Sequence, residues 1–473
     1  MRQVEQVQDS SSQILPGLLL ALILAFPAVV IAQAELWLTN PDKSALFQRQ
    51  SALLTFALAT NANPTIEVDE GKTYQPIDGF GFTLTGGSAM HIIRMEPAAR
   101  TALLRELFAA DSTNIGVSYL RLSIGASDLN ERVFSYDDLP AGQTDPELKQ
   151  FDLGPDRADV IPVLKAILAI NPVIKLLGSP WSAPPWMKTT NDTRGASLKP
   201  EFHDTYAKYF VKYIQAMKAE GIRIDAITIQ NEPLHPGNNP SMFMPAHQQA
   251  TFIKHSLGPA FAAAQLDTKI ILYDHNCDRP EYPLSILSDP EAAKYVDGSA
   301  FHLYAGKIEV LTTVHDAHPD KNLYFTEQWV GAPGNLQREL TRHVHELIIG
   351  AVRNWSRTVL EWNLAADPRC DPHTDRGGCE RCLGAVTVDG NQVTRNPAYY
   401  IIAHAAKFVR PGSVRIASNT LLTLPNVAFK TPDGGHVLIV LNNGQGRQSF
   451  NISHQGKLAT SSLNSNAVGT YLW

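Results

Sequence analysis

The feature that most constrains the fold is an alternation of short apolar runs with longer amphipathic stretches between residues 76 and 408. The stretches 204–219 and 245–264, for example, space their apolar residues as one face of a helix does. Strands that alternate with helices pair in parallel through crossover connections. Eight strand-like runs begin near residues 77, 116, 172, 224, 269, 298, 322 and 357. We therefore predict an α/β fold, a (β/α)₈ barrel over residues 76–408.

The pattern changes after the barrel. Residues 409–473 contain short β-rich segments separated by Gly, Asn and Pro turns, with no helical stretch between them. We predict that they form a small antiparallel β-sandwich. The strand-rich residues 35–75 are expected to complete this sandwich, which would bring the two chain ends together.

The first residues are typical of an export signal. Residues 14–32 are almost wholly apolar, and Ala32-Gln33-Ala34 has the small-x-small pattern of a cleavage site. A membrane anchor is the alternative, but Pro16 and Pro27 weaken a spanning helix. We predict that residues 1–34 are a signal peptide. The mature protein is then secreted or periplasmic, without a stable membrane span.

Four cysteines are present, and three of them cluster in the stretch CDPHTDRGGCERC. In an exported protein such a cluster favours a disulfide, for example Cys370 or Cys379 with Cys382. A zinc site would need a fourth ligand such as His373, and the spacing matches no standard zinc motif. The pairing stays open, and Cys277 fits a buried thiol.

Composition and motifs exclude several functions. The formal net charge is -6 and the isoelectric point is near 6.2, so we expect no nucleic-acid partner. The sequence contains no P-loop, no dinucleotide-binding glycine motif and no HExxH zinc motif. We expect neither a metal nor an organic cofactor.

Two glutamates stand where catalytic groups of a barrel belong. Active sites of such barrels lie at the C-terminal ends of the strands. The fourth predicted strand ends in Glu232 and the seventh in Glu327. Carboxyl groups about 5–5.5 Å apart serve retaining glycoside hydrolysis, one as nucleophile and the other as general acid/base. This pair therefore predicts a glycosidase.

Other strand-end residues have suitable chemistry for the same site. Arg121 and Tyr304 are expected to keep Glu327 ionised and aimed, and Asn231 to donate to the sugar 2-OH. Flat rings for stacking on a sugar are offered by Trp181, Trp329 and Trp362.

Each of these residues also has a structural interpretation. The tryptophans are compatible with core packing, and His302 with a hydrogen-bonded core imidazole. Glu361 is more typical of a structural partner for Arg or His. Their joint position at strand ends favours a site.

Several motifs resemble glycoside hydrolase family 30, the family of lysosomal glucosylceramidase, from about Tyr74 to Trp473. They are DGFGFTLTGGSAM, YLRLSIGASD, LLGSPWSAPPWMKT, ITIQNEP, DPEAAKYVDGSAFHLY, YFTEQWVG, EWNLA and GTYLW. The resemblance implies a barrel with a side β-sandwich, Glu232 as acid/base and Glu327 as nucleophile. The residues that fall where the family lines its glucose subsite are Arg121, Trp181, Asn231, His302, Tyr304 and Trp362.

The substrate is less constrained than the chemistry. Our main expectation is a retaining glucosylceramidase-like β-glucosidase, whose partner is a glycolipid, with a lipid-binding rim of Met242, Phe243, Met244 and Trp329. The alternative is a glucan substrate, because the segment after Glu232 and the insertion TDRGGCERCLGAVTVDG resemble a branch with endo-β-1,6-glucanases. A non-catalytic carbohydrate-binding protein is the candidate from another class.

One departure from glucosylceramidase bears on the substrate. Thr85-Gly86 stands in place of a Thr-Asp pair. We expect the glycine either to open the pocket wall or to make room for another side chain.

Overall fold

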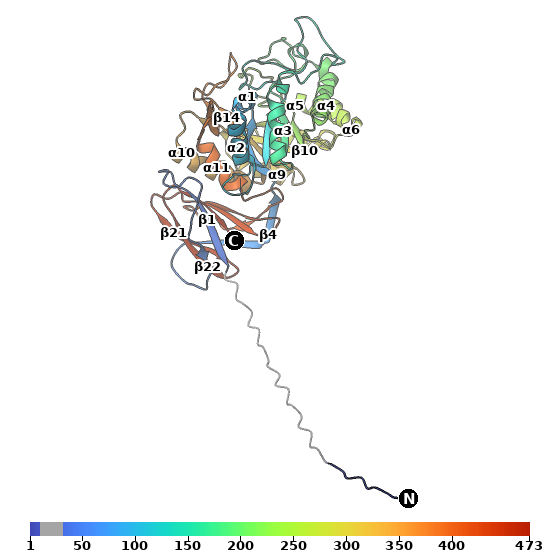
Figure 1. Ribbon diagram of the computed structural model, residues 1–473. Helices are drawn as coiled ribbons and strands as arrows, with labels where there is room; N and C mark the ends of the chain where they lie inside the picture. Colours follow the sequence, from blue (N-terminus) through green and yellow to red (C-terminus); the bar gives the residue numbers. More distant parts are fainter. Residues whose placement is uncertain (10–31) are drawn as a thin grey trace.

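The computed structural model describes residues 1–9 and 32–473 and contains a barrel and a sandwich (Figure 1). Most of the predicted signal peptide, residues 10–31, lies outside the described residues. Strand β1 begins at Gln33, two residues before the predicted mature start. Within the described residues, no helix has both the length and the apolar character that a membrane span requires.

The predicted barrel is confirmed. Eight parallel strands close in the order β10-β11-β13-β5-β6-β7-β8-β9, and each begins within a few residues of its predicted start. The strands are β5 (Gly79–Leu84), β6 (Tyr119–Ser123), β7 (Lys175–Ser179), β8 (Ala226–Thr228), β9 (Lys269–Cys277), β10 (Val296–Gly306), β11 (Asn322–Glu327) and β13 (Ser356–Asn363).

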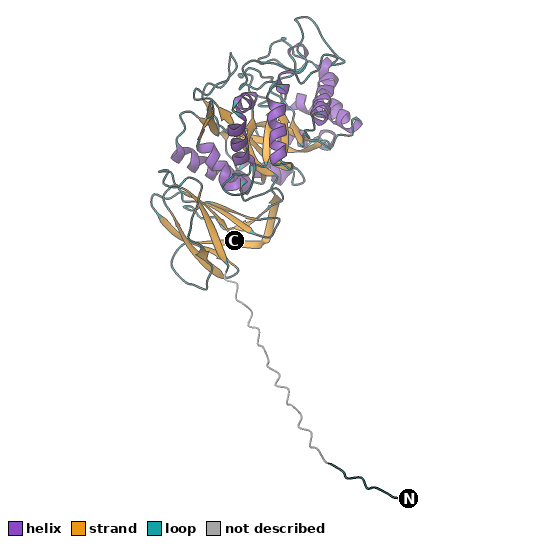
Figure 2. Ribbon diagram, in the orientation of Figure 1, coloured by secondary structure: helices purple, strands orange, loops and turns teal. Residues whose placement is uncertain are grey.

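Helices surround this barrel (Figure 2). They are α1 (Gly86–Arg94), α2 (Pro97–Phe108), α3 (Val160–Ile170), α4 (His203–Ala219), α5 (Ala246–Phe252), α6 (Gly258–Ala263), α7 (Glu281–Leu287), α8 (Pro290–Ala293), α9 (Val310–Ala317), α10 (Leu336–His343) and α11 (Pro397–Ala406). Short helical turns are η1 (Gly154–Arg157), η2 (Pro185–Met187) and η3 (Pro200–Phe202), and π-helical segments are η4 (Ile253–Leu257) and η5 (Val344–Ala351).

Helix α4 shows why these stretches are helical. Tyr206, Phe210, Tyr213 and Met217 recur every three or four residues and are all buried, so one face of the helix packs on the barrel. The second predicted helix, 245–264, forms as α5, η4 and α6 in succession.

The barrel interior is filled by side chains. One buried cluster takes a single residue from each of seven barrel strands: Tyr119, Leu177, Ala226, Ile271, Ala300, Tyr324 and Leu360. Such a layer makes the barrel a packed core and not a pore. The barrel interior therefore leaves no room for a ligand.

The sandwich combines both chain ends, as predicted. Its strands are β1 (Gln33–Thr39), β2 (Gln48–Arg49), β3 (Leu54–Thr55), β4 (Thr65–Pro76), β18 (Val414–Ser418), β19 (Asn426–Lys430), β20 (His436–Leu441), β21 (Gln448–His454), β22 (Lys457–Leu463) and β23 (Val468–Leu472). They form a sheet in the order β2-β1-β23-β20-β19-β18-β4-β21-β22, with β3 paired to β1.

Two details of the sandwich differ from the prediction. Strand β21 pairs in parallel with β4, and β4 is long enough to pair with β18 at one end and with β21 at the other. Strand β22 was not predicted, since its buried positions include the small or polar Ala459 and Ser461.

A buried histidine is one of the contacts that join the sandwich to the barrel. His404 of α11 is fully buried. Its ring nitrogens lie 2.8 Å from Thr39 Oγ1 in β1 and 2.8 Å from Thr470 Oγ1 in β23. Both chain ends are thus tied to the same barrel helix.

Small sheets extend beyond two barrel strands. β12 (Val330–Gly331), just after β11, pairs with β15 (Cys382–Leu383), and β14 (Ala365–Ala366), just after β13, pairs with β16 (Val386–Asp389), which pairs with β17 (Gln392–Arg395). The sequence pattern did not predict these short strands. They place the cysteine-containing insertion beside the barrel mouth.

Candidate active site

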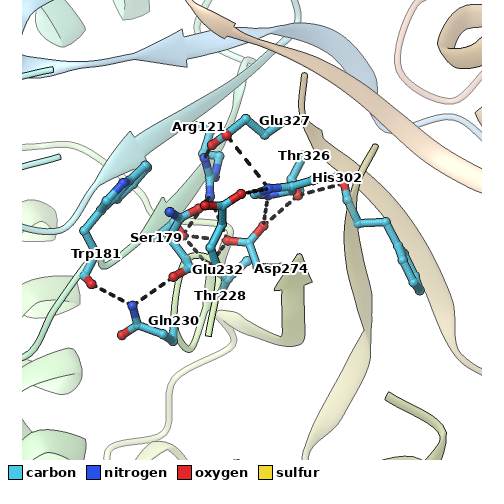
Figure 3. A network of polar contacts seen from close by, with 12 residues as sticks. Arg121, Ser179, Trp181, Thr228, Gln230, Glu232, Asp274, His302, Thr326 and Glu327 are labelled. Atoms are coloured by element: carbon cyan, nitrogen blue, oxygen red, sulfur yellow. Dashed lines mark hydrogen bonds and ion pairs between the residues drawn. The ribbon is translucent and has the colours of Figure 1, made fainter. Parts of the chain in front are cut away.

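All nine predicted site residues meet at the C-terminal ends of the barrel strands. Seven of them line a cavity of about 410 Å³: Trp181, Asn231, Glu232, Tyr304, Glu327, Trp329 and Trp362. The other two, Arg121 and His302, are fully buried and contact the glutamates (Figure 3).

Glu327 is the last residue of β11 and is held by two donors. Arg121 Nη1 donates to its Oε2 at 2.6 Å, and the Tyr304 hydroxyl donates to its Oε1 at 2.9 Å. Arg121 also donates from Nη2 to Asn231 Oδ1 at 2.6 Å. The carboxylate and the neighbouring amide are therefore oriented by one guanidinium group.

Asp274, in the second half of β9, is the centre of the network and was not predicted from the sequence. It is fully buried and accepts hydrogen bonds from five side chains: Arg121, Ser179, Thr228, His302 and Thr326. Although burial opposes it, the charges and hydrogen bonds of Arg121 and His302 hold the pKa of Asp274 well below its usual range. Asp274 is therefore a permanent anion beneath the cavity.

His302 bridges this anion to the glutamates. Its Nε2 lies 3.1 Å from Asp274 Oδ1, and its Nδ1 lies 3.3 Å from Glu232 Oε1 and 3.8 Å from Glu327 Oε1. Burial acts to lower the pKa of His302, but Glu327, Asp274 and Glu232 raise it to about 9. The imidazole is therefore positively charged at neutral pH, with both nitrogens protonated.

Glu232 follows β8 with a left-handed backbone, φ 46°. Residues other than glycine adopt this conformation at a cost and often do so at functional sites. Its backbone N–H is held by the carbonyl oxygen of Asp274 at 3.0 Å. The turn aims the side chain into the cavity, where one oxygen each of Glu232 and Glu327 lie within 4.8 Å of each other.

The two glutamates titrate as a pair. Burial raises the pKa of Glu327, while His302 and Arg121 counter that rise. Burial also acts on Glu232, but the hydrogen bond and charge of His302 outweigh it and lower the pKa of Glu232. The charge of His302 therefore controls how readily Glu232 carries a proton.

Aromatic rings form one wall of the cavity. The rings of Trp181 and Trp362 are 5.2 Å apart, and the Arg121 guanidinium lies 4.8 Å from the Trp181 ring centre. Trp329 lies over Gly331, where a Cβ would come within 2.9 Å of the indole. Because Gly331 has no side chain, the Trp329 ring can pack directly against its backbone.

Asp128 is a further cavity residue that the sequence reasoning missed. It is buried and lines the same cavity as both glutamates. Burial, with the charges of Glu327 and Glu232, raises its pKa to about 7. It ends the family-like stretch YLRLSIGASD, and it reaches the cavity through the path of the loop after β6, which no sequence pattern indicates.

Polar side chains surround Glu232. His235, Asn238, His275 and Asn276 line the cavity. Burial lowers the pKa of His275 to about 4, so this ring is neutral at neutral pH. None of the four was predicted. His235 and Asn238 stand beyond the strand-end Glu232, and His275 and Asn276 belong to β9, from which no site residue was predicted.

The proposed lipid-binding rim is not formed as predicted. Met242 and Met244 are fully buried in the barrel core, while Phe243 is 37% exposed. The segment is extended, so alternate side chains point in opposite directions. Two of the four rim residues are therefore inaccessible to a ligand.

Three remaining predictions are resolved by contacts. Glu361 accepts from His343 Nδ1 at 2.6 Å, the structural role favoured for it. Cys379 and Cys382 form the disulfide, and Cys277 and Cys370 are buried thiols. A Cβ at Gly86 would lie 2.0 Å from Asn130 Nδ2. Gly86 thus makes room for a side chain and does not open the pocket.

Comparisons with known proteins agree with this site. The model of the glycosyl hydrolase family 30 TIM-barrel domain matches residues 77–409, and that of the family 30 beta sandwich domain matches residues 412–471. An endo-1,6-beta-D-glucanase of Neurospora crassa is 37% identical over 82% of this chain and 82% of its own length. Lysosomal acid glucosylceramidase of Mus musculus is 32% identical over 90% of this chain and 87% of its own length.

A solved structure gives the same result. The endo-beta1,6-glucanase BT3312 has a TM-score of 0.86 and 35% sequence identity, over 93% of this chain and 99% of its own. Family models cover most of the sequence, and the barrel, the sandwich and the pair of strand-end glutamates are all in place. The chain belongs to glycoside hydrolase family 30.

Proposed function

We propose that this glycoside hydrolase is an endo-β-1,6-glucanase that acts with retention of anomeric configuration. The relatives support this substrate, because the Neurospora crassa and BT3312 enzymes are both named as endo-1,6-glucanases and are more similar to this chain than the mouse glucosylceramidase is. The observation that carries the proposal is that polar side chains line the cavity around Glu232. Such side chains can hydrogen-bond a sugar leaving group, whereas a lipid leaving group would need apolar contacts.

The proposed mechanism is a double displacement. Glu327 attacks the anomeric carbon while Glu232 protonates the leaving oxygen, and water, deprotonated by Glu232, then releases the sugar from Glu327. The oxygen separation within 4.8 Å supports retention, because inverting enzymes place their carboxyl groups about 6.5–9.5 Å apart.

Hydrogen bonding supports this division of roles. Glu327 accepts from Arg121 and Tyr304 at 2.6 and 2.9 Å, as an ionised nucleophile requires. The Glu232 carboxyl group has a longer hydrogen bond, 3.3 Å between its Oε1 and His302 Nδ1. In the free site, the charge of His302 nevertheless favours an ionised Glu232. We propose that a bound sugar, by covering the cavity, shifts the shared proton to Glu232.

The cavity lining supports a carbohydrate on both sides of the cleaved bond. Trp181 and Trp362 present rings to one sugar, and Asp128 a carboxyl group to its hydroxyls. The leaving group would meet polar residues such as Asn238 and His275 beside Glu232. A ceramide would need apolar contacts there, and the buried Met242 and Met244 do not supply them.

Glucosylceramide hydrolysis is the second candidate. The similarity to the mouse enzyme over 90% of this chain favours it. A non-catalytic carbohydrate-binding role is disfavoured because both carboxylates and their donors are in place.

The deciding experiment compares two substrates. Purified protein is incubated with a linear β-1,6-glucan and, separately, with glucosylceramide in detergent micelles. We expect oligosaccharides of several lengths from the glucan and no ceramide. Release of ceramide with an intact glucan would contradict the proposed substrate. Proton NMR of the first products reports the mechanism, and an initial α-anomer would contradict retention.

Two variants test the catalytic roles. Glu327→Gln should lower kcat by at least about 10³-fold, since residues that act chemically carry effects of that size. Glu232→Gln should also lose activity on the glucan. Both variants should keep the wild-type melting temperature within a few degrees. Full activity in either one would remove that residue from the mechanism.

We also propose that the protein is exported. The signal-like first 34 residues and the paired cysteines support an oxidising destination. Fractionation of expressing cells, with N-terminal sequencing of the product, tests this. Uncleaved protein confined to the cytoplasm would contradict it.

A further inference from the structure

The cysteine-containing insertion contacts three parts of the active site. We call residues 374–383 the disulfide turn, after the bond between Cys379 and Cys382. Both cysteines line the cavity that also holds the two glutamates. The disulfide turn is therefore part of the site surface and not a distant surface staple.

The first contact is with the loop that carries Asp128. Thr374 N–H donates to the backbone oxygen of Asp128 at 2.9 Å. The backbone of Cys379 hydrogen-bonds the Asp128 carboxyl group and acts to lower its pKa. The disulfide turn thus fixes both the backbone and the side chain of this cavity carboxyl group.

The second contact is with the segment after Glu232. The Thr374 hydroxyl donates to the backbone oxygen of Asn239, and Asn239 Nδ2 donates to Asp375 Oδ1 at 2.9 Å. The first half of the disulfide turn is thereby bound to the loop that follows one glutamate.

The third contact is with the segment after Glu327. β15, which contains Cys382, pairs antiparallel with β12, three residues beyond that glutamate. Cys382 also packs in one buried cluster with Trp181 and Trp362, and Cys379 lies against the same cluster with Trp329. The disulfide therefore backs the aromatic wall of the cavity.

We infer that the closed disulfide turn is a wall of the sugar-binding subsite and that the intact Cys379–Cys382 bond sets the affinity for a glucose unit. The inference rests on the proposed use of this cavity for a sugar. A disulfide excludes water from one side of the tryptophan pair and holds the Cys379 N–H against Asp128. Cutting it leaves two thiols that are free to separate, so the wall relaxes and the subsite widens.

Reduction by a dithiol cuts the bond in a balanced exchange. One dithiol thiolate attacks a cysteine sulfur, the S–S bond breaks, and the second dithiol sulfur displaces the protein thiolate. The protein gains two electrons and two protons as two thiols, and the dithiol leaves as a cyclic disulfide.

The test measures binding as well as turnover. The double variant C379S/C382S is compared with wild type and with C370S, a control that changes a buried thiol just before the insertion and outside the disulfide. The probe is 1-deoxynojirimycin, a glucose-shaped iminosugar, by calorimetry. We expect the Kd of the probe and the KM for the glucan to rise at least about tenfold in C379S/C382S, with kcat changed by less than about threefold. C370S should match wild type.

A second measurement tests the inference without the double variant, in case that variant folds poorly. Wild type is treated with dithiothreitol under native conditions, and mass spectrometry confirms two free thiols in the 374–383 peptide. Probe affinity should fall on reduction and return on reoxidation. Unchanged affinity after confirmed reduction overturns the inference, as does an equal loss in C370S.

The inference and the proposed function fail in different ways. A wild type that binds the iminosugar but leaves β-1,6-glucan intact contradicts the proposed substrate, and the effect of the disulfide on probe affinity still decides the inference. A wild type that cleaves the glucan with unchanged KM after reduction supports the function and overturns the inference.

Discussion

At the scale of single residues, the site is built around a charge that no substrate touches. Asp274 lies beneath the cavity and binds Arg121 and His302, which in turn contact the two glutamates. Strand-end position identified both glutamates from the sequence. It did not identify Asp274, because the residues around it in the sequence, KIILY before it, do not show that five other barrel strands supply its hydrogen-bond donors.

The first prediction concerns this buried anion. Asp274→Asn should lower the free energy of unfolding at pH 7 by about 3 kcal/mol, since breaking a buried ion pair leaves a charge uncompensated. A depressed carboxyl pKa contributes stability that is present above about pH 3.9 and is lost as the pH falls below it. The deficit should therefore be constant above about pH 4 and shrink in stronger acid.

Urea unfolding monitored by tryptophan fluorescence at several pH values measures this deficit. Asp316→Asn, on an exposed face of α9, is the matched control and should behave like wild type. A D274N variant as stable as wild type at pH 7 would show that the network does not depend on this charge.

The second prediction concerns His302, whose charge holds the pKa of Glu232 down. The substitution His302→Asn removes this charge and should therefore raise the pKa of Glu232. The general acid then keeps its proton to higher pH, so the alkaline limb of kcat/KM should move upward while the maximum falls. Tyr304→Phe, which keeps the imidazolium, should leave that limb near its wild-type position. A downward shift in H302N would contradict the proposed coupling.

The same histidine predicts a change of stability with pH. Its folded pKa of about 9 exceeds the unfolded value of about 6.5, so its contribution is complete below the lower value. It should be lost as the pH rises toward the higher one. Wild type should therefore weaken relative to H302N across that interval in urea titrations. A difference between the two proteins that stays constant with pH would contradict a charged His302.

At the scale of elements, sequence patterns located long and regular segments and missed short ones. Each barrel strand was predicted because it is an apolar run between turns. Strands of two residues such as β12 and β15 have no pattern of their own, since they form only where another segment lies alongside. The aromatic wall and the disulfide turn depend on those contacts, so the shape of the cavity was beyond prediction.

The third prediction concerns the junction of α1 with the loop after β6. Gly86→Ala places a Cβ against Asn130, whose Oδ1 accepts the Ser127 N–H at 2.9 Å. Overpacking of this kind should cost about 1–3 kcal/mol and displace the Asp128 loop. Thermal unfolding measures the loss. Gly446→Ala, with open space around it, is the control.

A second substitution checks the cause. Combining Gly86→Ala with Asn130→Gly removes the clashing side chain, so the double variant should be affected less than the sum of the two single variants. Additive losses would mean that the two positions do not meet.

At the scale of the whole molecule, one buried joint between the barrel and the sandwich is made by His404. The prediction that both chain ends form the sandwich came from strand-rich composition and is confirmed. The joint itself was not foreseen, because His404 stands in an apolar helix and its partners, Thr39 and Thr470, lie at opposite ends of the sequence.

The fourth prediction concerns acid sensitivity at this joint. Burial lowers the pKa of His404 to about 3, well below the unfolded value of about 6.5. The contribution of His404 to the free energy of unfolding is therefore complete above the unfolded pKa, and it is lost as the pH falls below that value. His404→Gln should be less stable than wild type at pH 8, and the gap should narrow between about pH 6.5 and 4.

Chemical unfolding at pH 8, 6 and 4.5 measures this gap, with the exposed His247→Gln as control. A gap that widens in acid would mean that His404 is not held neutral.

The pairing of β1 with β23 also has a consequence for how the chain is made. At about 5–20 residues per second, a ribosome completes β23 at least about 20 s after β1 has emerged. During that interval β1 and β4 are strands without a sheet, with open edges that invite pairing with other chains. The sandwich is therefore the last part of the enzyme that can close, because its final strand is also the last one to be made.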